Sequence, residues 1–315
     1  MNGRLRLPKT NLEVSPLCLG TNVFGWSADE ETSKRILSTF FSKGGNFLDT
    51  ADMYSEWKPG NVGGESETII GNWLTETGNR DQIVLASKVA KYSKRRGLSA
   101  QNIKAAAEDS LRRLQTDYLD IYYAHEDDET TPLEESLSAL NDLVQSGKVR
   151  YVAASNYSGA RLAEALAISV KLGFAPYIAI QNNYNILTRE PFETDVAPEL
   201  QTEGISAIPF YGLARGFLSG KYRPGVSIDS VRAEGVKQFQ NERGWKVLAA
   251  LEELAKSHGV SLSAVALAWL RGQETVSVPI ASARTLGQLE EIMETVLLSP
   301  DELQIINQAS LITSD

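Results

Sequence analysis

The feature that most constrains the fold is a regular alternation of short apolar runs with longer amphipathic segments. The expected strands are residues 17–19, 46–48, 83–87, 118–124, 149–154, 177–180, 205–209 and 275–278. The segments between several of them have the apolar spacing of helices, at residues 66–77, 99–114, 132–145 and 158–172. Strands that alternate with helices predict a parallel α/β fold, and eight units favour a closed (β/α)8 TIM barrel over an open sheet.

Other segments lie outside this repeat. Residues 4–7 and 12–14 predict an N-terminal β-hairpin, and helices are expected near residues 29–43 and 195–201. Extra C-terminal helices are expected at residues 245–258, 261–271, 284–297 and 300–311. Residues 211–244 show little periodicity, and a loop of that length in a compact domain is usually functional or disordered. We expect a single domain that spans residues 1–315.

Composition and charge exclude several functions. The formal net charge of −9 argues against binding to nucleic acid, which favours a basic face. Two histidines and one cysteine cannot form a multi-histidine or multi-cysteine metal site, so no metal is expected. Apolar runs are too short to span a membrane, and the first residues lack the apolar core of a signal peptide, so we expect a cytoplasmic protein.

The expected strands end in polar residues, and in a (β/α) barrel these ends meet at one face. Asp49 and Tyr54 follow the second strand, Lys88 ends the third and His125 ends the fourth. A phenol has an ordinary pKa near ~10, and a nearby ammonium lowers it by favouring the phenolate. Lys88 would then tune Tyr54, Asp49 would orient Lys88, and His125 would contact a carbonyl oxygen. Taken singly, these residues could instead be a turn cap, a loop aromatic, a solvated charge and a backbone-bonded histidine.

Several motifs make the sequence resemble the aldo-keto reductases. They are Phe-Leu-Asp-Thr-Ala-Asp-Met-Tyr, Leu-Ala-Ser-Lys-Val, Tyr-Tyr-Ala-His-Glu-Asp-Asp and Ala-Ala-Ser-Asn-Tyr-Ser, in the order and spacing of that family. The resemblance implies a (β/α)8 barrel, NADPH as cofactor and the reversible reduction of aldehydes and ketones, with a small carbonyl compound as substrate. It also implies a catalytic tetrad of Asp49, Tyr54, Lys88 and His125.

The same resemblance implies a set of cofactor-binding residues. Ser155, Asn156 and Gln181 match positions that bond the nicotinamide carboxamide, and Phe210 or Tyr211 would stack on its ring. The full expected set is Gly20, Thr21, Asn22, Asp49, Ser155, Asn156, Gln181, Phe210, Tyr211, Gly212, Leu213, Arg215, Gly216, Lys221, Ser282, Ala283, Arg284, Gln288 and Glu291.

The segment that leads from the last strand into a helix is the most informative about the nucleotide. In the family, an arginine at the position of Arg284 grips the 2′-phosphate, so the resemblance implies NADPH in preference to NADH. Gln288 and Glu291 match adenosine contacts. Ile292 is a departure, because relatives commonly have an asparagine there that contacts adenine.

Aromatic residues in loops after strand ends suggest a substrate pocket. Trp26, Trp57 and Tyr92 would supply an apolar wall beside Tyr54 and His125.

Two other functions remain open at this point. One is an NADP(H)-binding regulatory or partner protein, resembling a potassium-channel β subunit, because such subunits keep the tetrad. The other is a lyase or hydrolase that uses the acidic run 126–129. The physiological substrate, the preferred direction of the reaction and the oligomeric state do not follow from the sequence.

Overall fold

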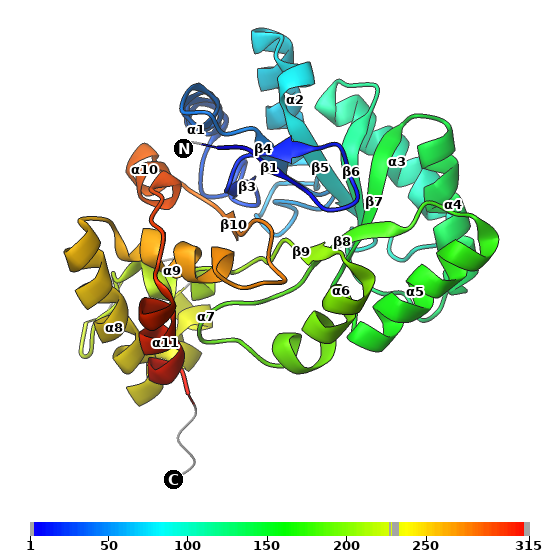
Figure 1. Ribbon diagram of the computed structural model, residues 1–315. Coiled ribbons are helices and arrows are strands. Elements are labelled where there is room, and N and C mark those ends of the chain that lie inside the picture. The colour runs from blue at the N-terminus through cyan, green and yellow to red at the C-terminus, as the bar shows by residue number, and fades with distance from the viewer. Residues whose placement is uncertain (1–2, 227, 229–232, 312–315) are drawn as a thin grey trace.

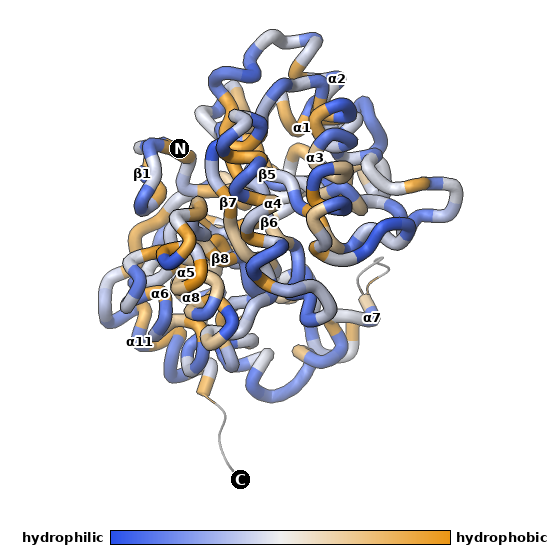
Figure 2. Tube along the Cα trace, turned by 90° about the vertical axis from the view of Figure 1, so that its right-hand side faces the viewer, coloured by the Kyte–Doolittle hydropathy of each residue, from blue (hydrophilic) through white to orange (hydrophobic). Residues whose placement is uncertain are grey.

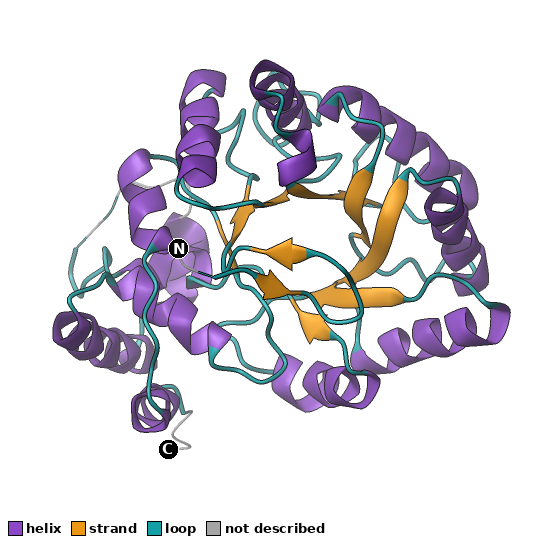
Figure 3. Ribbon diagram, turned by 45° about the horizontal axis from the view of Figure 1, so that its top comes forward, coloured by secondary structure: helices purple, strands orange, loops and turns teal. Residues whose placement is uncertain are grey.

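The computed structural model describes residues 3–226, 228 and 233–311. Within them, a parallel eight-stranded sheet has the order β10-β3-β4-β5-β6-β7-β8-β9, and Figure 3 shows these strands as a ring inside a ring of helices. The strands are β3 (Cys18–Gly20), β4 (Phe47–Asp49), β5 (Val84–Val89), β6 (Leu119–Ala124), β7 (Val149–Ser155), β8 (Tyr177–Gln181), β9 (Ser206–Ala207) and β10 (Ile280–Ala281). The predicted (β/α)8 barrel is confirmed.

Helices follow the strands along the outside of the sheet (Figure 1). The helices that follow β3 to β8 are α1 (Glu30–Ser42), α2 (Glu65–Thr77), α3 (Ala100–Leu114), α4 (Leu133–Gln145), α5 (Gly159–Leu172) and α6 (Ala197–Glu203). Several begin at a residue whose side chain caps the first turn. The Asp29 side chain accepts a hydrogen bond from the Thr32 amide at the start of α1, and Ser99 caps α3 in the same way.

The barrel closes through the segment that precedes β10. The Ala207 amide donates to the Thr275 carbonyl (2.7 Å), and the Ser277 amide donates to the Ala207 carbonyl (3.0 Å). The expectation of a last strand at residues 275–278 was wrong in its bounds, because that run forms only an isolated bridge at Val276. Pro279 then interrupts the run, since proline has no N–H to donate, and regular pairing with β3 starts at Ile280.

A short hairpin closes the end of the barrel that lies opposite the carboxyl ends of the strands. Strands β1 (Leu5–Arg6) and β2 (Glu13–Val14) form it, as the sequence predicts. Leu7, Leu12 and Val14 are buried with the side chains that fill the barrel interior. In Figure 2 the hydrophobic stretches gather towards the interior, whereas the outer loops are mostly hydrophilic. The opposite end is therefore the one left open to ligands.

Asp120 is a charged residue inside strand β6. It is 1% exposed, and its carboxylate accepts hydrogen bonds from Arg80 (2.9 Å) and Arg150 (2.8 Å). The Leu85 amide also donates to it at 3.0 Å. A buried charge is tolerated when it is paired and hydrogen-bonded, and Asp120 meets both conditions.

The long segment after β9 contains more structure than its weak periodicity predicts. It holds η3 (Ala214–Ser219), α7 (Ala233–Val236) and η4 (Lys237–Phe239), while residues 227 and 229–232 lie outside the described ranges. The extra C-terminal helices are α8 (Glu242–His258), α9 (Leu262–Arg271), α10 (Leu286–Met293) and α11 (Pro300–Ala309).

Two of these helices differ from their predicted bounds. Helix α8 begins before residue 245 because the Asn241 side chain accepts a hydrogen bond from the Gly244 amide and caps it. Helix α10 is shorter than residues 284–297, since Thr285 caps its start and Glu294 is already extended. Across the described residues, none of the helices combines the length and apolarity needed to cross a membrane.

The contact between α2 and α3 gives a test of the packing. A Cβ atom on Gly71 in α2 would lie 2.2 Å from the Arg113 carbonyl oxygen in α3. Gly71→Ala should therefore lower the free energy of unfolding by about 1–3 kcal/mol, as overpacking of a tight interface does. Urea unfolding measures this change.

Gly287→Ala in α10 is the matched control. No other atom would lie within 4 Å of its new Cβ, so the substitution should be neutral or slightly stabilising. Equal stability of the two variants would contradict the close approach of α2 and α3.

Candidate active site

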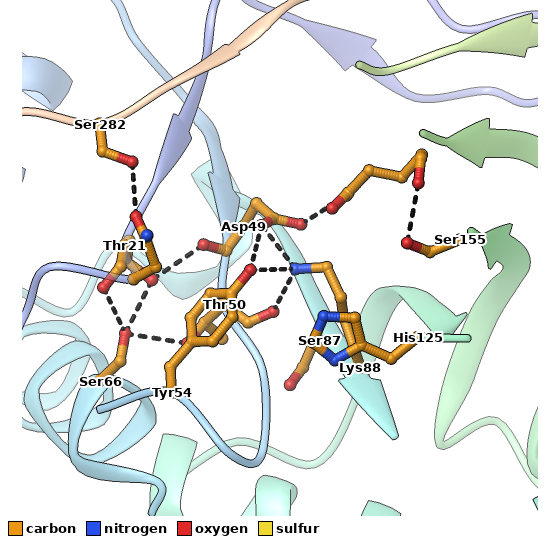
Figure 4. A network of polar contacts seen from close by, with 12 residues as sticks. Thr21, Asp49, Thr50, Tyr54, Ser66, Ser87, Lys88, His125, Ser155 and Ser282 are labelled. Atoms are coloured by element: carbon orange, nitrogen blue, oxygen red, sulfur yellow. Dashed lines mark hydrogen bonds and ion pairs between the residues drawn. The ribbon is translucent and has the colours of Figure 1, made fainter. Parts of the chain in front are cut away.

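Polar side chains from neighbouring strands meet at the open end of the barrel. Asp49 is the last residue of β4, Lys88 lies near the end of β5, and His125 follows β6 directly. Tyr54 lies in the loop after β4. Figure 4 shows the Lys88 ammonium between the Asp49 carboxylate and the Tyr54 hydroxyl. The structure thus brings together the four residues of the expected tetrad.

The Lys88 ammonium has an acceptor for each of its three N–H donors. It donates to Asp49 Oδ2 at 2.6 Å, to the Thr50 carbonyl at 2.8 Å and to the Tyr54 hydroxyl at 2.9 Å. Lys88 is 0% exposed and Asp49 is 2% exposed. The position of the Tyr54 oxygen is therefore fixed by an ion pair that water does not reach.

The other oxygen of the Asp49 carboxylate is also held. Gln181 at the end of β8 donates to Asp49 Oδ1 at 2.9 Å. Ser155 at the end of β7 donates in turn to the Gln181 carbonyl at 2.8 Å. Hydrogen bonds thus connect Asp49 with groups on β5, β7 and β8, so small shifts of one strand would disturb the whole site.

The pKa of Tyr54 lies well above its ordinary value, and the expectation of a lowered pKa was wrong. Burial of the phenol is the main cause, and the Asp49 carboxylate beside it adds to the effect. Both disfavour the phenolate, although a cation lies beside the phenol oxygen. Burial also lowers the pKa of Lys88, against the opposing effect of Asp49. The phenol of the free protein therefore keeps its proton at neutral pH.

His125 is held neutral next to this phenol. Its pKa lies well below the ordinary value because the ring is buried and because Lys88 and Lys91 are cationic neighbours. Its Nδ1 atom is buried and has no hydrogen-bond partner among the described residues. The rings of His125 and Tyr54 lie edge to face at 6.0 Å. A neutral imidazole and a protonated phenol thus face the same space.

A cavity of about 660 Å³ opens over these side chains. It is lined by most of the expected cofactor residues, namely Gly20, Asn22, Asp49, Ser155, Asn156, Gln181, Phe210, Tyr211, Gly212, Leu213, Arg215, Gly216, Lys221, Ser282, Arg284, Gln288 and Glu291. Tyr54, Trp57 and His125 line it as well. Thr21 and Ala283 do not, because both are buried behind the wall.

Two of the expected substrate residues lie away from the cavity. Trp26 packs edge to face against Trp57 at 5.7 Å, and therefore supports a lining residue instead of lining the cavity itself. The Tyr92 hydroxyl donates to the Val62 carbonyl at 2.8 Å.

The structure adds lining residues that sequence reasoning missed. They are Val23, Met53, Lys91, Ser219, Ser263, Ile280 and Ala281, while Ile292, noted from the sequence, lines the cavity too. A position just after a strand end was the one available signal, and it applies to Lys91.

The loop after β9 runs along one side of the cavity. Tyr211, Ala214, Arg215 and Gly216 all have positive φ, between 46° and 98°. The Ala214 and Gly216 amides donate to the Tyr211 and Leu213 carbonyls (2.7 and 2.8 Å), so these turns hold the loop in shape, and its cationic side chains face the cavity. A Cβ on Gly216 would lie 3.7 Å from Lys221 Nζ, so a cation lies beside this backbone.

The start of α10 forms the far end of the cavity. Thr285 caps the helix, and the Arg284 amide donates to the Gln288 side chain at 2.9 Å. Arg284, Gln288 and Glu291 line the cavity together with Ile292. A helix N-terminus beside an arginine favours a negatively charged group.

Fold and site together define a (β/α)8-barrel protein with a buried Asp–Lys–Tyr constellation and a long, partly cationic cavity. The sequence model of the Aldo/keto reductase family matches residues 16–311. The chain therefore belongs to this family of oxidoreductases, which act on aldehydes and ketones.

Full-length relatives are consistent with that membership. The chain is 34% identical to the uncharacterized oxidoreductase YrpG of Bacillus subtilis, with 96% of this chain and 94% of the relative covered. It is 32% identical to the protein tas of Escherichia coli, with 94% of each chain covered. It is 31% identical to an aryl-alcohol dehydrogenase [NADP(+)] of Phanerodontia chrysosporium, with 95% of this chain and 83% of the relative covered.

Asp52 is a buried acid in the same loop as Tyr54 that the sequence did not single out. It is 1% exposed, and neither of its carboxyl oxygens has a hydrogen-bond partner among the described residues. Burial, followed by the charge of Glu67, raises the pKa of Asp52 to about 8, against the opposing effects of Arg113 and Arg95. Asp52 is therefore largely protonated at neutral pH.

This raised pKa predicts a pH dependence of stability. The pKa of Asp52 is higher in the folded than in the unfolded chain, so its contribution to stability is lost as pH rises from about 4 to about 8. An asparagine does not ionise, so Asp52→Asn lacks this pH-dependent loss of stability. The stability of the variant relative to wild type should therefore grow by about 3 kcal/mol between pH 5 and pH 8.

Urea unfolding at pH 5, 6.5 and 8 measures the difference. The exposed Asp117→Asn is the matched control for a surface carboxylate. A constant difference between Asp52→Asn and wild type over this range would show that Asp52 has the same pKa in both states.

Proposed function

We propose that the protein is an NADPH-dependent reductase that converts aldehydes or ketones to alcohols, with Tyr54 as the proton donor. The observation that carries this proposal is the 2.9 Å hydrogen bond from the buried Lys88 ammonium to the Tyr54 hydroxyl at the floor of the cavity. A phenol that is fixed, neutral and next to a cation is suited to give up its proton only when a strong base forms beside it.

The residues present fit a nicotinamide dinucleotide. The side-chain amides of Asn156 and Gln181 and the hydroxyl of Ser155 offer the donors and acceptors that a carboxamide needs. The loop that carries Arg215 and Lys221 lines the cavity with positive charge that suits a pyrophosphate, and Arg284 at the start of α10 suits a further phosphate. Bound here, the nicotinamide would supply the hydride.

The protein's own side chains would donate the proton and stabilise the negative charge that develops. As the carbonyl oxygen becomes an alkoxide, the proton on Tyr54 Oη moves to it. The Lys88 ammonium then stabilises the phenolate, and Asp49 keeps Lys88 in position (2.6 Å). The neutral His125 would hydrogen-bond to the same substrate oxygen. Positioned donors at a developing negative charge stabilise the transition state.

Arg284 supports NADPH over NADH. It lines the far end of the cavity beside the capped start of α10, where a 2′-phosphate would meet both a guanidinium and a helix N-terminus. The similar aryl-alcohol dehydrogenase of Phanerodontia chrysosporium is also named for NADP(+). Ile292 lines this end too and offers no hydrogen bond to an adenine edge.

Tyr54→Phe tests the proton donor. The variant should lose turnover of aldehydes by about 100- to 10,000-fold, because it lacks the transferable proton. Its affinity for NADPH should stay near that of wild type. Loss of NADPH absorbance measures turnover, and fluorescence titration measures binding.

Tyr118→Phe is the control, since Tyr118 lies just before β6 at the far end of the barrel and stacks with Arg80 (3.9 Å). Wild-type turnover in Tyr54→Phe would remove Tyr54 from the role of proton donor. Binding of NADPH without turnover in either protein would favour a regulatory function for the cofactor site.

Arg284→Ala tests the choice of nucleotide. Loss of a charged hydrogen-bond donor should weaken NADPH binding by about 10- to 100-fold and NADH binding much less. Isothermal titration with each nucleotide gives the comparison, and Arg284→Lys should show a smaller loss. Equal losses for NADPH and NADH would remove Arg284 from the phosphate site.

A further inference from the structure

Lys91 places a cation at the end of the cavity where a carbonyl substrate would enter. It lies in the loop after β5, close in sequence to Lys88, and lines the cavity together with Met53, Trp57 and His125. Strands β3 and β4 separate β5 from β10 in the sheet, so Lys91 and Arg284 come from different sectors of the barrel. Lys91 is not among the residues proposed to contact the nucleotide.

The backbone that carries Lys91 is strained. The preceding residue, Ala90, has φ of 120° and is fully buried. Residues with a Cβ rarely adopt this conformation, and they keep it only where the surrounding structure enforces it. The Gly97 amide donates to the Ala90 carbonyl at 2.9 Å and helps to hold the turn. The fold thus holds the loop that carries Lys91 in a backbone conformation of raised energy.

The charge of Lys91 is only partly compensated. Its ammonium lies 3.2 Å from Glu126, and the two side chains are 34% and 36% exposed. A partly exposed ion pair of this kind contributes little to stability. An ammonium has three N–H donors, so an entering anion can share Lys91 with Glu126. Lys91 lines the cavity and Glu126 does not. The field of Lys91 also reaches the catalytic end, since it helps to lower the pKa of His125.

Trp57 provides an apolar surface in the same part of the cavity. It is 41% exposed. Its ring packs edge to face with Tyr54 (6.1 Å) and with Trp26 (5.7 Å), so its orientation is fixed from two sides. A flat aromatic ring that covers Trp57 would bury apolar surface while its carbonyl lies near Tyr54.

We propose that Lys91 is a specificity-determining residue that selects aryl aldehydes bearing a carboxylate. The aldehyde would lie at Tyr54 and His125, the ring against Trp57, and the carboxylate at the Lys91 ammonium. This inference rests on the proposed reductase function and adds the substrate class to it. Charge-assisted hydrogen bonds to an ammonium are stronger than neutral ones, so the carboxylate should decide affinity within this class.

Matched substrates test the proposal. The 2-, 3- and 4-carboxybenzaldehydes are compared with the corresponding formylbenzamides, which have nearly the same shape but no charge. Wild type should favour at least one carboxylate isomer by about tenfold in kcat/KM. The preference should fall as salt is added, because screening weakens a partly exposed ion pair.

Variants assign the preference to one side chain. Lys91→Gln should remove the preference, Lys91→Arg should keep most of it, and Glu126→Gln should increase it by freeing the ammonium. Lys94→Gln in the same loop is the control, since Lys94 is exposed and does not line the cavity. An unchanged ratio of kcat/KM values in Lys91→Gln would overturn the proposal.

A binding measurement separates this inference from the reductase function. Calorimetry with NADP+ present compares the carboxybenzyl alcohols with the hydroxymethylbenzamides, and needs no turnover. If no aldehyde is reduced but wild type binds the carboxylates more tightly and Lys91→Gln does not, the reductase function fails and the anion site stands. Equal affinities for the charged and neutral compounds in wild type would overturn the anion site.

Discussion

The ion pair between Lys88 and Asp49 is the interaction on which the site depends. Removing two charges from water costs several kcal/mol for each ion, and a buried pair is tolerated only if the remaining donors and acceptors are also satisfied. Here the ammonium donates to Asp49, Thr50 and Tyr54, and the second carboxylate oxygen accepts from Gln181. These partners come from β4, β5, β8 and the loop after β4, so the pair is stable only in a correctly registered barrel.

The environment that makes this ion pair costly also determines how the tyrosine works. In a water-poor pocket the phenolate is disfavoured, and the pKa of Tyr54 rises although a cation lies 2.9 Å from its oxygen. Lys88 therefore fixes the position of the resting phenol while the phenol keeps its proton. Its effect appears when the proton has left and the negative charge is next to the ammonium. The same low polarity raises the pKa of Asp52 to about 8.

The sequence predicts the features that repeat or that use characteristic residue types. Alternating strands and helices predict the barrel, and polar residues at strand ends predict that Asp49, Lys88 and His125 lie close together. Features that depend on tertiary context could not be predicted. The last strand of the barrel is interrupted at Pro279, so that only Ile280–Ala281 pairs regularly with β3, and apolarity alone does not mark that interruption. Whether a lysine such as Lys91 reaches the cavity depends on the turn at Ala90, which no local pattern indicates.

The two ends of the barrel differ in how they are packed and in how much backbone strain they hold. At the closed end the hairpin fills the barrel with Leu7 and Leu12, and each carboxylate oxygen of Asp120 has an arginine partner. The open end holds much of the backbone strain, because several non-glycine residues with positive φ lie in its loops, namely Ser55, Ala90, Asn156, Tyr211, Ala214 and Arg215. Such strain persists only where surrounding structure over-determines it. The packing of the closed end and of the helices around it therefore allows the open end to keep the strained loops and unpaired polar atoms that a ligand can use.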